Sequence, residues 1–237
     1  MEVGFFTMPI HPLDKDYRKT LAEDREAFLL ADEIGFSEAY CGEHYTDAAE
    51  NITSSTVFIA SLAAATKNIR LGTGTVNLPN SHPAAVAGQI AMLDHMLDGR
   101  LNFGISPGGL ASDAEVFGNL EKNRNEMFVE CIDMILEIWK REAPYSIKGK
   151  YWEVTTEKTQ MTDIGQGIMP KPLQKPYPPI ICTVVAPYSK GIQLQQQEVG
   201  NQYLQTFYYQ NGLKLIGQDT LKDVSKQNLK QTLWIGE

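Results

Sequence analysis

Residues 68–106 decide the fold, and they read NIRLGTG, TVNLPNS, HPAAVAGQIAMLDHMLDGR and LNFGIS in turn. The first and last of these pieces are short apolar runs, which predict buried strands. A helix is predicted between them, because Pro83 suits a first helical turn and Gly99 a helix end. Its apolar stripe consists of Val86, Ile90, Leu93 and Leu97. This stretch therefore predicts a strand, a covering helix and a second strand.

The same alternation continues on both sides of this stretch. Upstream, we predict strands at residues 3–8 and 37–42, a helix at 17–34 that Gly35 ends, and a helix at 54–67. Downstream, we predict a helix at 124–139 and a strand at 180–186. In the helix at 54–67, one face is predicted to hold Phe58, Leu62 and Ala65. In the helix at 124–139, the inward face is predicted to hold Met127, Cys131, Met134 and Ile138.

Repeated β/α units indicate an α/β fold with a parallel sheet covered by helices, either a (β/α)8 TIM barrel or an open doubly wound sheet. No strand is followed by a GxGxxG turn with an acidic residue further on, which favours the barrel. The repeat supplies about five β/α units, so we expect an incomplete barrel.

Composition narrows the class of protein. The chain has 237 residues, 43% of them hydrophobic, and a formal net charge of −8, which argues against a nucleic-acid partner. Apolar runs are too short to span a bilayer and the N-terminus lacks a basic signal region, so we expect a cytoplasmic protein with no membrane partner. Three widely spaced cysteines favour structural thiols over disulfides or zinc.

Polar residues gather where strands are predicted to end, which is where parallel α/β folds bind ligands. His11, His44 and His82 all lie in such segments. The adjacent Glu43 and His44 can form a carboxylate–imidazole pair that acts as a general base or as a hydrogen-bond donor, or they can merely cap a loop. His11 and His82 each precede proline, which favours a turn. No spacing of histidines supports a metal site.

Three segments carry a resemblance: EAYCGEHYTD (38–47), the stretch from Ala65 to Gly109, and DAEVFG (113–118). They resemble the bacterial luciferase-like flavin monooxygenase family, in particular its limonene-monooxygenase-like and alkanal-oxidising branch. The resemblance implies a (β/α)8 barrel that binds reduced FMN and uses O2 through a C4a-peroxyflavin on a small apolar organic substrate. It also implies a separate flavin reductase as partner and allows a homo- or heterodimer. The alternative is a non-catalytic flavin-binding protein or an inactive remnant.

The resemblance also implies site residues. His44, Glu43 and Asp113 match catalytic positions. Cofactor-binding positions are matched by Gly74, Thr75, Asn102, Ser106, Arg124, Val185, Ala186, Tyr188 and Ser189. In family members the dipeptide at Gly74–Thr75 can hold a non-proline cis bond, and the arginine at Arg124 meets the flavin phosphate. The chain departs from the luciferases at Ser106 and Pro107, where they carry Cys and Arg, which argues against long-chain aldehyde bioluminescence.

The resemblance covers residues 1–192, the predicted barrel domain. Residues 193–237 hold ten Gln, whereas residues 1–192 hold four. When the codons of Leu194 to Gly217 are shifted by one base, they are compatible with the strings that the family has at this place. We therefore predict a non-homologous tail that is translated out of frame. A barrel cut short in this way is expected to leave an open sheet edge, with which YLQTFYY (203–209) can pair.

Overall fold

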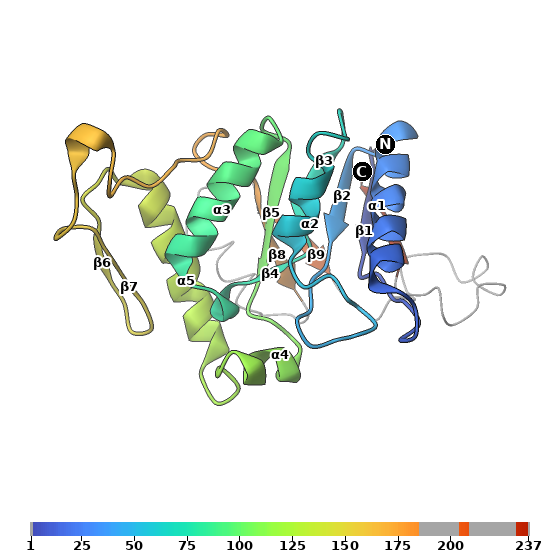
Figure 1. Ribbon diagram of the computed structural model, residues 1–237, viewed down its shortest axis with the longest axis horizontal. Helices are drawn as coiled ribbons and strands as arrows, with labels where there is room; N and C mark the ends of the chain where they lie inside the picture. Colours follow the sequence, from blue (N-terminus) through green and yellow to red (C-terminus); the bar gives the residue numbers. More distant parts are fainter. Residues whose placement is uncertain (1, 185–203, 209–230, 237) are drawn as a thin grey trace. The chain divides into compact units, whose positions relative to one another are not determined.

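The structure is a computed structural model, and it describes residues 2–184, 204–208 and 231–236. Its elements are, in chain order, β1 (Glu2–Thr7), α1 (Tyr17–Glu33), β2 (Glu38–Cys41), α2 (Ser55–Leu62), β3 (Arg70–Thr73), β4 (Val76–Asn77), η1 (Leu78–Asn80), α3 (Pro83–Met96), β5 (Leu101–Ser106), α4 (Ala111–Val116), α5 (Arg124–Lys140), β6 (Ser146–Lys148), β7 (Glu153–Thr155), η2 (Thr162–Ile164), β8 (Ile180–Val184), β9 (Leu204–Tyr208) and β10 (Gln231–Gly236). The predicted order of strands and helices is confirmed. Figure 1 shows this order along the ribbon.

The chain divides into two compact units. The first comprises residues 1–76, 102–105 and 179–237, and the second comprises residues 77–101 and 106–178. The first unit contains most of the sheet together with α1 and α2. The second contains α3, α4, α5 and the β6–β7 hairpin.

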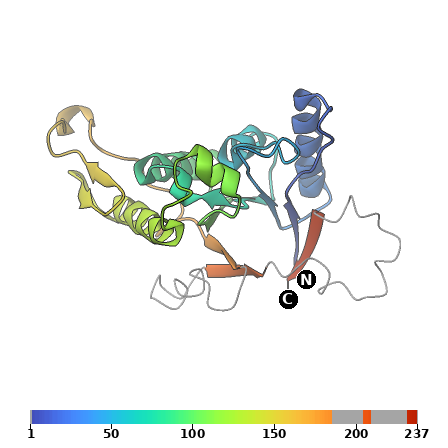
Figure 2. The same cartoon turned by 90° about the horizontal axis from the view of Figure 1, so that it is seen from below.

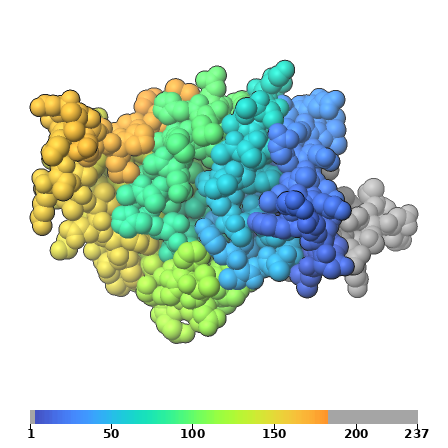
Figure 3. All heavy atoms as spheres, viewed as in Figure 1, coloured from blue at the N-terminus to red at the C-terminus, as the bar shows by residue number. Residues whose placement is uncertain are grey.

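The sheet has the strand order β10-β1-β2-β3-β5-β8-β9. Its pairs β1–β2, β2–β3, β5–β8 and β8–β9 are parallel, as the β/α alternation predicts. Helices α1 and α2 lie on the same face of β1–β3, as Figures 1 and 2 show. The two helices adjoin at the surface of this unit (Figure 3).

An aromatic cluster packs these two helices onto the sheet. The Phe28 ring of α1 lies edge-on to Phe5 of β1, with centroids 5.4 Å apart, and to Phe58 of α2, with centroids 5.3 Å apart. Edge-to-face rings add to the free energy of burial. Phe58 and Leu62 are buried as predicted, but the prediction for Ala65 is wrong. Helix α2 ends at Leu62, before Ala65, and that side chain is exposed.

The ends of α1 and α3 match their sequence signals. Gly35 and Gly99 follow these helices with φ of 88° and 76°, a left-handed conformation that glycine adopts without a steric penalty. Helix α3 begins at Pro83, and the Nδ1 atom of His82 accepts a hydrogen bond from the backbone N–H of Ala84. His82 is therefore the N-cap of α3, where the sequence favoured a turn. All four residues of the predicted α3 stripe are buried.

Two strands from the tail extend the sheet beyond β8 and β1. β9 pairs with β8 in parallel, and β10 pairs with β1 in antiparallel fashion. The expected pairing of YLQTFYY with an edge is confirmed, since β9 lies within that segment. Within the described residues the strand path runs from β10 to β9, so the expected open edges fall on these two strands instead of on β1 and β8.

Candidate functional site

The segment after β2 carries the Glu43–His44 pair. The carboxylate of Glu43, which is buried, accepts hydrogen bonds from the backbone N–H of Ser55 at 2.9 Å and from its hydroxyl at 2.7 Å. Ser55 is the first residue of α2, where backbone N–H groups lack helical partners. Glu43 therefore anchors the start of α2.

His44 pairs with another carboxylate. Its Nε2 atom lies 3.3 Å from Oε2 of Glu50, and both side chains are largely buried. The sequence leaves two roles open for the Glu43–His44 pair, a coupled carboxylate and imidazole or a loop cap. In the structure Glu43 caps the start of α2, and Glu50 faces the imidazole. Only the acidic character of Glu50, six residues further on in the same loop, was visible in the sequence.

Gly74 lies where β3 ends, and the peptide bond between Gly74 and Thr75 is cis, as the resemblance implies. The backbone N–H of Gly74 donates to the carbonyl of Cys41 at 2.7 Å. A Cβ atom at this position would lie 2.8 Å from Cε2 of Phe6, which is closer than real Cβ contacts. The close packing around this position therefore requires glycine.

Asn102 is the second residue of β5 and belongs to a buried polar network. Its amide nitrogen donates to Glu38 at 3.1 Å and to the hydroxyl of Tyr40 at 2.8 Å, and its oxygen accepts from Nε of Arg70 at 3.0 Å. Burial, followed by the neighbouring Glu38, raises the pKa of Tyr40. Glu38 and Arg70 begin β2 and β3, so the structure directs the Asn102 amide toward the amino ends of these strands.

The second unit brings Ser106 and Arg124 together at one glycine. The Ser106 hydroxyl accepts from the backbone N–H of Gly108 at 3.1 Å and donates to Oδ1 of Asn77 at 2.7 Å. The Nη1 atom of Arg124, the first residue of α5, donates to the carbonyl of Gly108 at 2.9 Å. Asp113 is buried within α4, a short helix that the sequence did not predict.

Arg124 is chemically suited to the phosphate of a flavin. A guanidinium has five N–H donors, and the bond to Gly108 uses one of them. The arginine also begins a helix, where the helix dipole favours an anion. The remaining predicted cofactor residues, Val185, Ala186, Tyr188 and Ser189, lie outside the described residues.

The second unit also holds a cavity of about 260 Å³. Tyr151 and Trp152 of the hairpin line it, together with His82, Phe117 and Lys122. The two aromatic residues of this hairpin therefore lie beside a cavity of the second unit.

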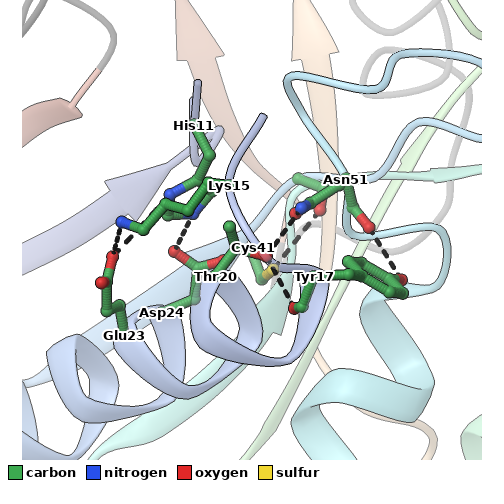
Figure 4. Close-up of polar contacts among 9 residues, drawn as sticks. His11, Lys15, Tyr17, Thr20, Glu23, Asp24, Cys41 and Asn51 are labelled. Carbon is green, nitrogen blue, oxygen red and sulfur yellow. Dashed lines mark hydrogen bonds and ion pairs between the residues drawn. The ribbon is translucent and has the colours of Figure 1, made fainter. Parts of the chain in front are cut away.

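A separate buried cluster surrounds Asp24 in the first unit (Figure 4). Nε2 of His11 lies 2.9 Å from Oδ1 of Asp24, and the Asn51 amide donates to the Thr20 hydroxyl at 2.7 Å. Within the described residues, Oδ2 of Asp24 and Oδ1 of Asn51 are buried and have no hydrogen-bond partner. Burial raises the pKa of Asp24, against the opposing effect of its hydrogen bond with His11.

Two kinds of site concern metal ions and membranes. The described side chains include no group of three or more His, Cys, Asp or Glu residues arranged to hold a metal ion. No helix in the described part of the chain has the length and apolar character needed to cross a bilayer. The three cysteines are free and buried, and burial raises the pKa of Cys41 and brings that of Cys182 to about 12.

Comparison with known proteins identifies relatives. Limonene 1,2-monooxygenase from Rhodococcus erythropolis is 36% identical over 57% of this chain and 35% of its own length. The oxygenase component of the flavin-dependent trigonelline monooxygenase from Acinetobacter baylyi is 33% identical over 77% of this chain and 48% of its own.

A solved structure supports the same relationship. The oxygenating constituent of 3,6-diketocamphane monooxygenase from Pseudomonas putida, in complex with FMN, superposes with a TM-score of 0.73 and 28% identity. The match covers 82% of this chain and 54% of that one, so the chain spans about half the length of these relatives or less. The structural neighbours have the luciferase-like TIM-barrel fold, which confirms the predicted fold class. The family model for luciferase-like monooxygenases matches residues 1–189. This chain belongs to the luciferase-like monooxygenase family.

Proposed function

We propose that this chain is a flavin-dependent monooxygenase, or the flavin-binding part of one, that acts on a small apolar organic substrate. The reaction consumes reduced FMN, O2 and substrate, and it yields oxidised FMN, the substrate with one added oxygen atom, and water. The observation that carries the proposal is the likeness to the FMN-bound diketocamphane protein over 82% of this chain. A separate flavin reductase would supply the reduced cofactor, because the trigonelline relative is the oxygenase component of its system.

In the first unit, we assign the proton-handling role to His44. Its imidazole is the titratable group at the end of β2 that can accept or donate a proton near neutral pH. Gly74 and Thr75, at the end of β3, are the proposed contacts to the flavin ring. The close packing around Gly74 leaves no room for a Cβ atom, so this residue presents its backbone at the strand end. Glu43 supports this region through α2.

In the second unit, we assign phosphate binding to Arg124. Its bond to Gly108 orients the guanidinium and leaves further N–H groups for an anion, which an arginine can bind in bidentate fashion. Ser106 orders the same loop through Gly108. Asp113, buried in α4 directly after this loop, is proposed to belong to the same active site.

Flavin binding tests the proposal first. We expect reduced FMN, titrated anaerobically into the purified full chain, to bind with saturation, and the Arg124→Met variant to bind at least about tenfold more weakly. The matched control is Arg141→Met, because Arg141 lies at the other end of α5. Equal affinities for all three proteins would remove Arg124 from the site.

Oxygen chemistry tests it second. Mixing the bound complex with aerated buffer and a panel of small ketones and terpenes should give an oxygenated product detectable by mass spectrometry. Stable flavin binding without product would instead support a non-catalytic flavin-binding protein. Insoluble chain would indicate an inactive remnant.

A further inference from the structure

A short loop holds His44 in place. The backbone N–H of His44 donates to the carbonyl of Ile52 at 3.0 Å, so the chain returns beside its starting point. Inside the loop, Oδ1 of Asp47 accepts from the backbone N–H groups of Ala49 at 2.9 Å and Glu50 at 3.2 Å. These bonds fix the backbone of Glu50 relative to that of His44.

This geometry brings one carboxylate to one ring nitrogen. Oε2 of Glu50 lies 3.3 Å from Nε2 of His44, and the two side chains are 6% and 18% exposed. Burial reduces solvent screening, so the charge of the carboxylate acts strongly on the ring. Of the other carboxylates nearby in sequence, Glu43 is bonded to Ser55 and Asp47 to the backbone of the loop.

We propose that Glu50 is a positioning residue for His44 that holds the imidazole proton on Nε2. An ionised carboxylate only accepts hydrogen bonds, so the nitrogen that faces it is stabilised as N–H. A neutral imidazole carries a single proton, so Nδ1 is then the acceptor. Whatever group meets Nδ1 must offer a hydrogen.

The sequence context leaves His44 open as a general base or as a hydrogen-bond donor. This tautomer assigns it the role of general base, through Nδ1. Neutral His44 takes a proton at Nδ1 from an O–H or N–H group that donates to this nitrogen. The Nδ1 lone pair forms the new N–H bond, the electron pair of the broken bond stays on the donor atom, and the imidazolium has its positive charge beside the Glu50 carboxylate. The proton returns from the same nitrogen later in the cycle. The catalytic meaning of this step rests on the proposed monooxygenase function, whereas the tautomer does not.

The tautomer can be read directly by ¹⁵N NMR of the full chain labelled at histidine, without flavin. The signals of His44 are identified by their loss in a His44→Gln variant. At alkaline pH, where the ring is neutral, we expect a protonated Nε2 and an unprotonated Nδ1. A proton on Nδ1 would overturn the proposal, and this measurement needs no variant at Glu50.

A Glu50→Gln variant tests the cause. Its amide can present either an acceptor or a donor to the ring, so we expect the His44 signals to shift toward a mixture of tautomers. Glu33→Gln removes the same charge from the exposed end of α1 and should leave these signals unchanged. Unchanged signals in Glu50→Gln would contradict the proposal.

Activity separates this inference from the proposed function. If the chain oxygenates a substrate, Glu50→Gln should lower kcat at least about tenfold and preserve the affinity for reduced FMN. An unaltered kcat would refute the positioning role. If the wild-type chain shows no oxygenation, the proposed function fails, and the tautomer seen by NMR still decides whether Glu50 orients His44.

Discussion

Asp94 and Gln174 are joined by two hydrogen bonds across 80 residues of chain. The Gln174 backbone N–H donates to Oδ2 of Asp94 at 2.8 Å, and its side-chain amide donates to Oδ1 at 2.7 Å. The same amide nitrogen also donates to the carbonyl of Leu101 at 2.9 Å. Asp94 is fully buried on α3, so this pair ties the proline-rich segment to the helix and to the start of β5.

Asp94→Ala should destabilise the protein by about 1 to 3 kcal/mol, because it leaves a Gln174 N–H group without its acceptor. Urea unfolding followed by circular dichroism measures the change. Glu121→Gln, an exposed substitution, serves as the control and should stay within about 0.5 kcal/mol of wild type. In a double-mutant cycle with Gln174→Ala, we expect the two losses to be less than additive, and full additivity would show that the pair does not interact energetically.

Asp32 should be a second stability determinant, in the first unit. Its carboxylate accepts from three consecutive backbone N–H groups, those of Lys67, Asn68 and Ile69, at 2.8 to 3.0 Å. Asp32→Ala is expected to cost about 1 to 3 kcal/mol, and Asp32→Asn, which keeps one acceptor oxygen, less. Amide hydrogen exchange would add a local test, because residues 67–69 should lose protection first. Unchanged protection there would contradict this role.

Asp24 should give a pH dependence of defined sign. Burial raises its pKa above the usual 3.8, so the folded protein holds this proton more tightly than the unfolded chain. The stability that the proton contributes is complete below the unfolded pKa and is lost as the pH rises through the folded pKa. The stability of wild type minus that of Asp24→Asn should therefore fall with rising pH across the acid range. Chemical unfolding at a series of pH values measures it, and a rising difference would be incompatible with this assignment.

Two glycine substitutions should act in opposite directions. Gly74→Ala places a Cβ against Phe6 and should destabilise the fold by about 1 to 3 kcal/mol through overpacking. Gly88→Ala, within α3, meets no atom within 4 Å and should stabilise the fold by about 0.5 to 1 kcal/mol. Thermal unfolding compares the two variants, and similar shifts for both would rule out the steric argument for Gly74.

The tail carries a prediction about the gene. We expect a reading-frame change near Ile192, so resequencing should show codons that spell the family strings in a neighbouring frame. An uninterrupted frame whose codons cannot spell those strings would end this proposal. The pairing of β9 with β8 and of β10 with β1 does not test this prediction, because backbone hydrogen bonds can pair strands of many sequences.

Sequence reasoning reached the elements of the fold more easily than the contacts of the site. Helix α5 was predicted almost to its ends, because its buried residues Met127, Cys131, Met134 and Ile138 repeat at helical spacing. Helix α4 was missed, because six residues are too few for a period to emerge. Ala65 was assigned to the buried face of a helix that stops at Leu62, since propensity does not show where packing ends a helix.

The sequence by itself determined the alternation of strands and helices, their order, and the family, because these depend on local periodicity and on motifs that are contiguous in the chain. Only the tertiary structure decided that Glu43 binds Ser55 while Glu50 faces His44, and that Gly108 joins Ser106 to Arg124. Such pairings depend on how loops return in space. Hydrogen bonds and ion pairs act over a few ångströms between side chains, whatever their separation along the chain.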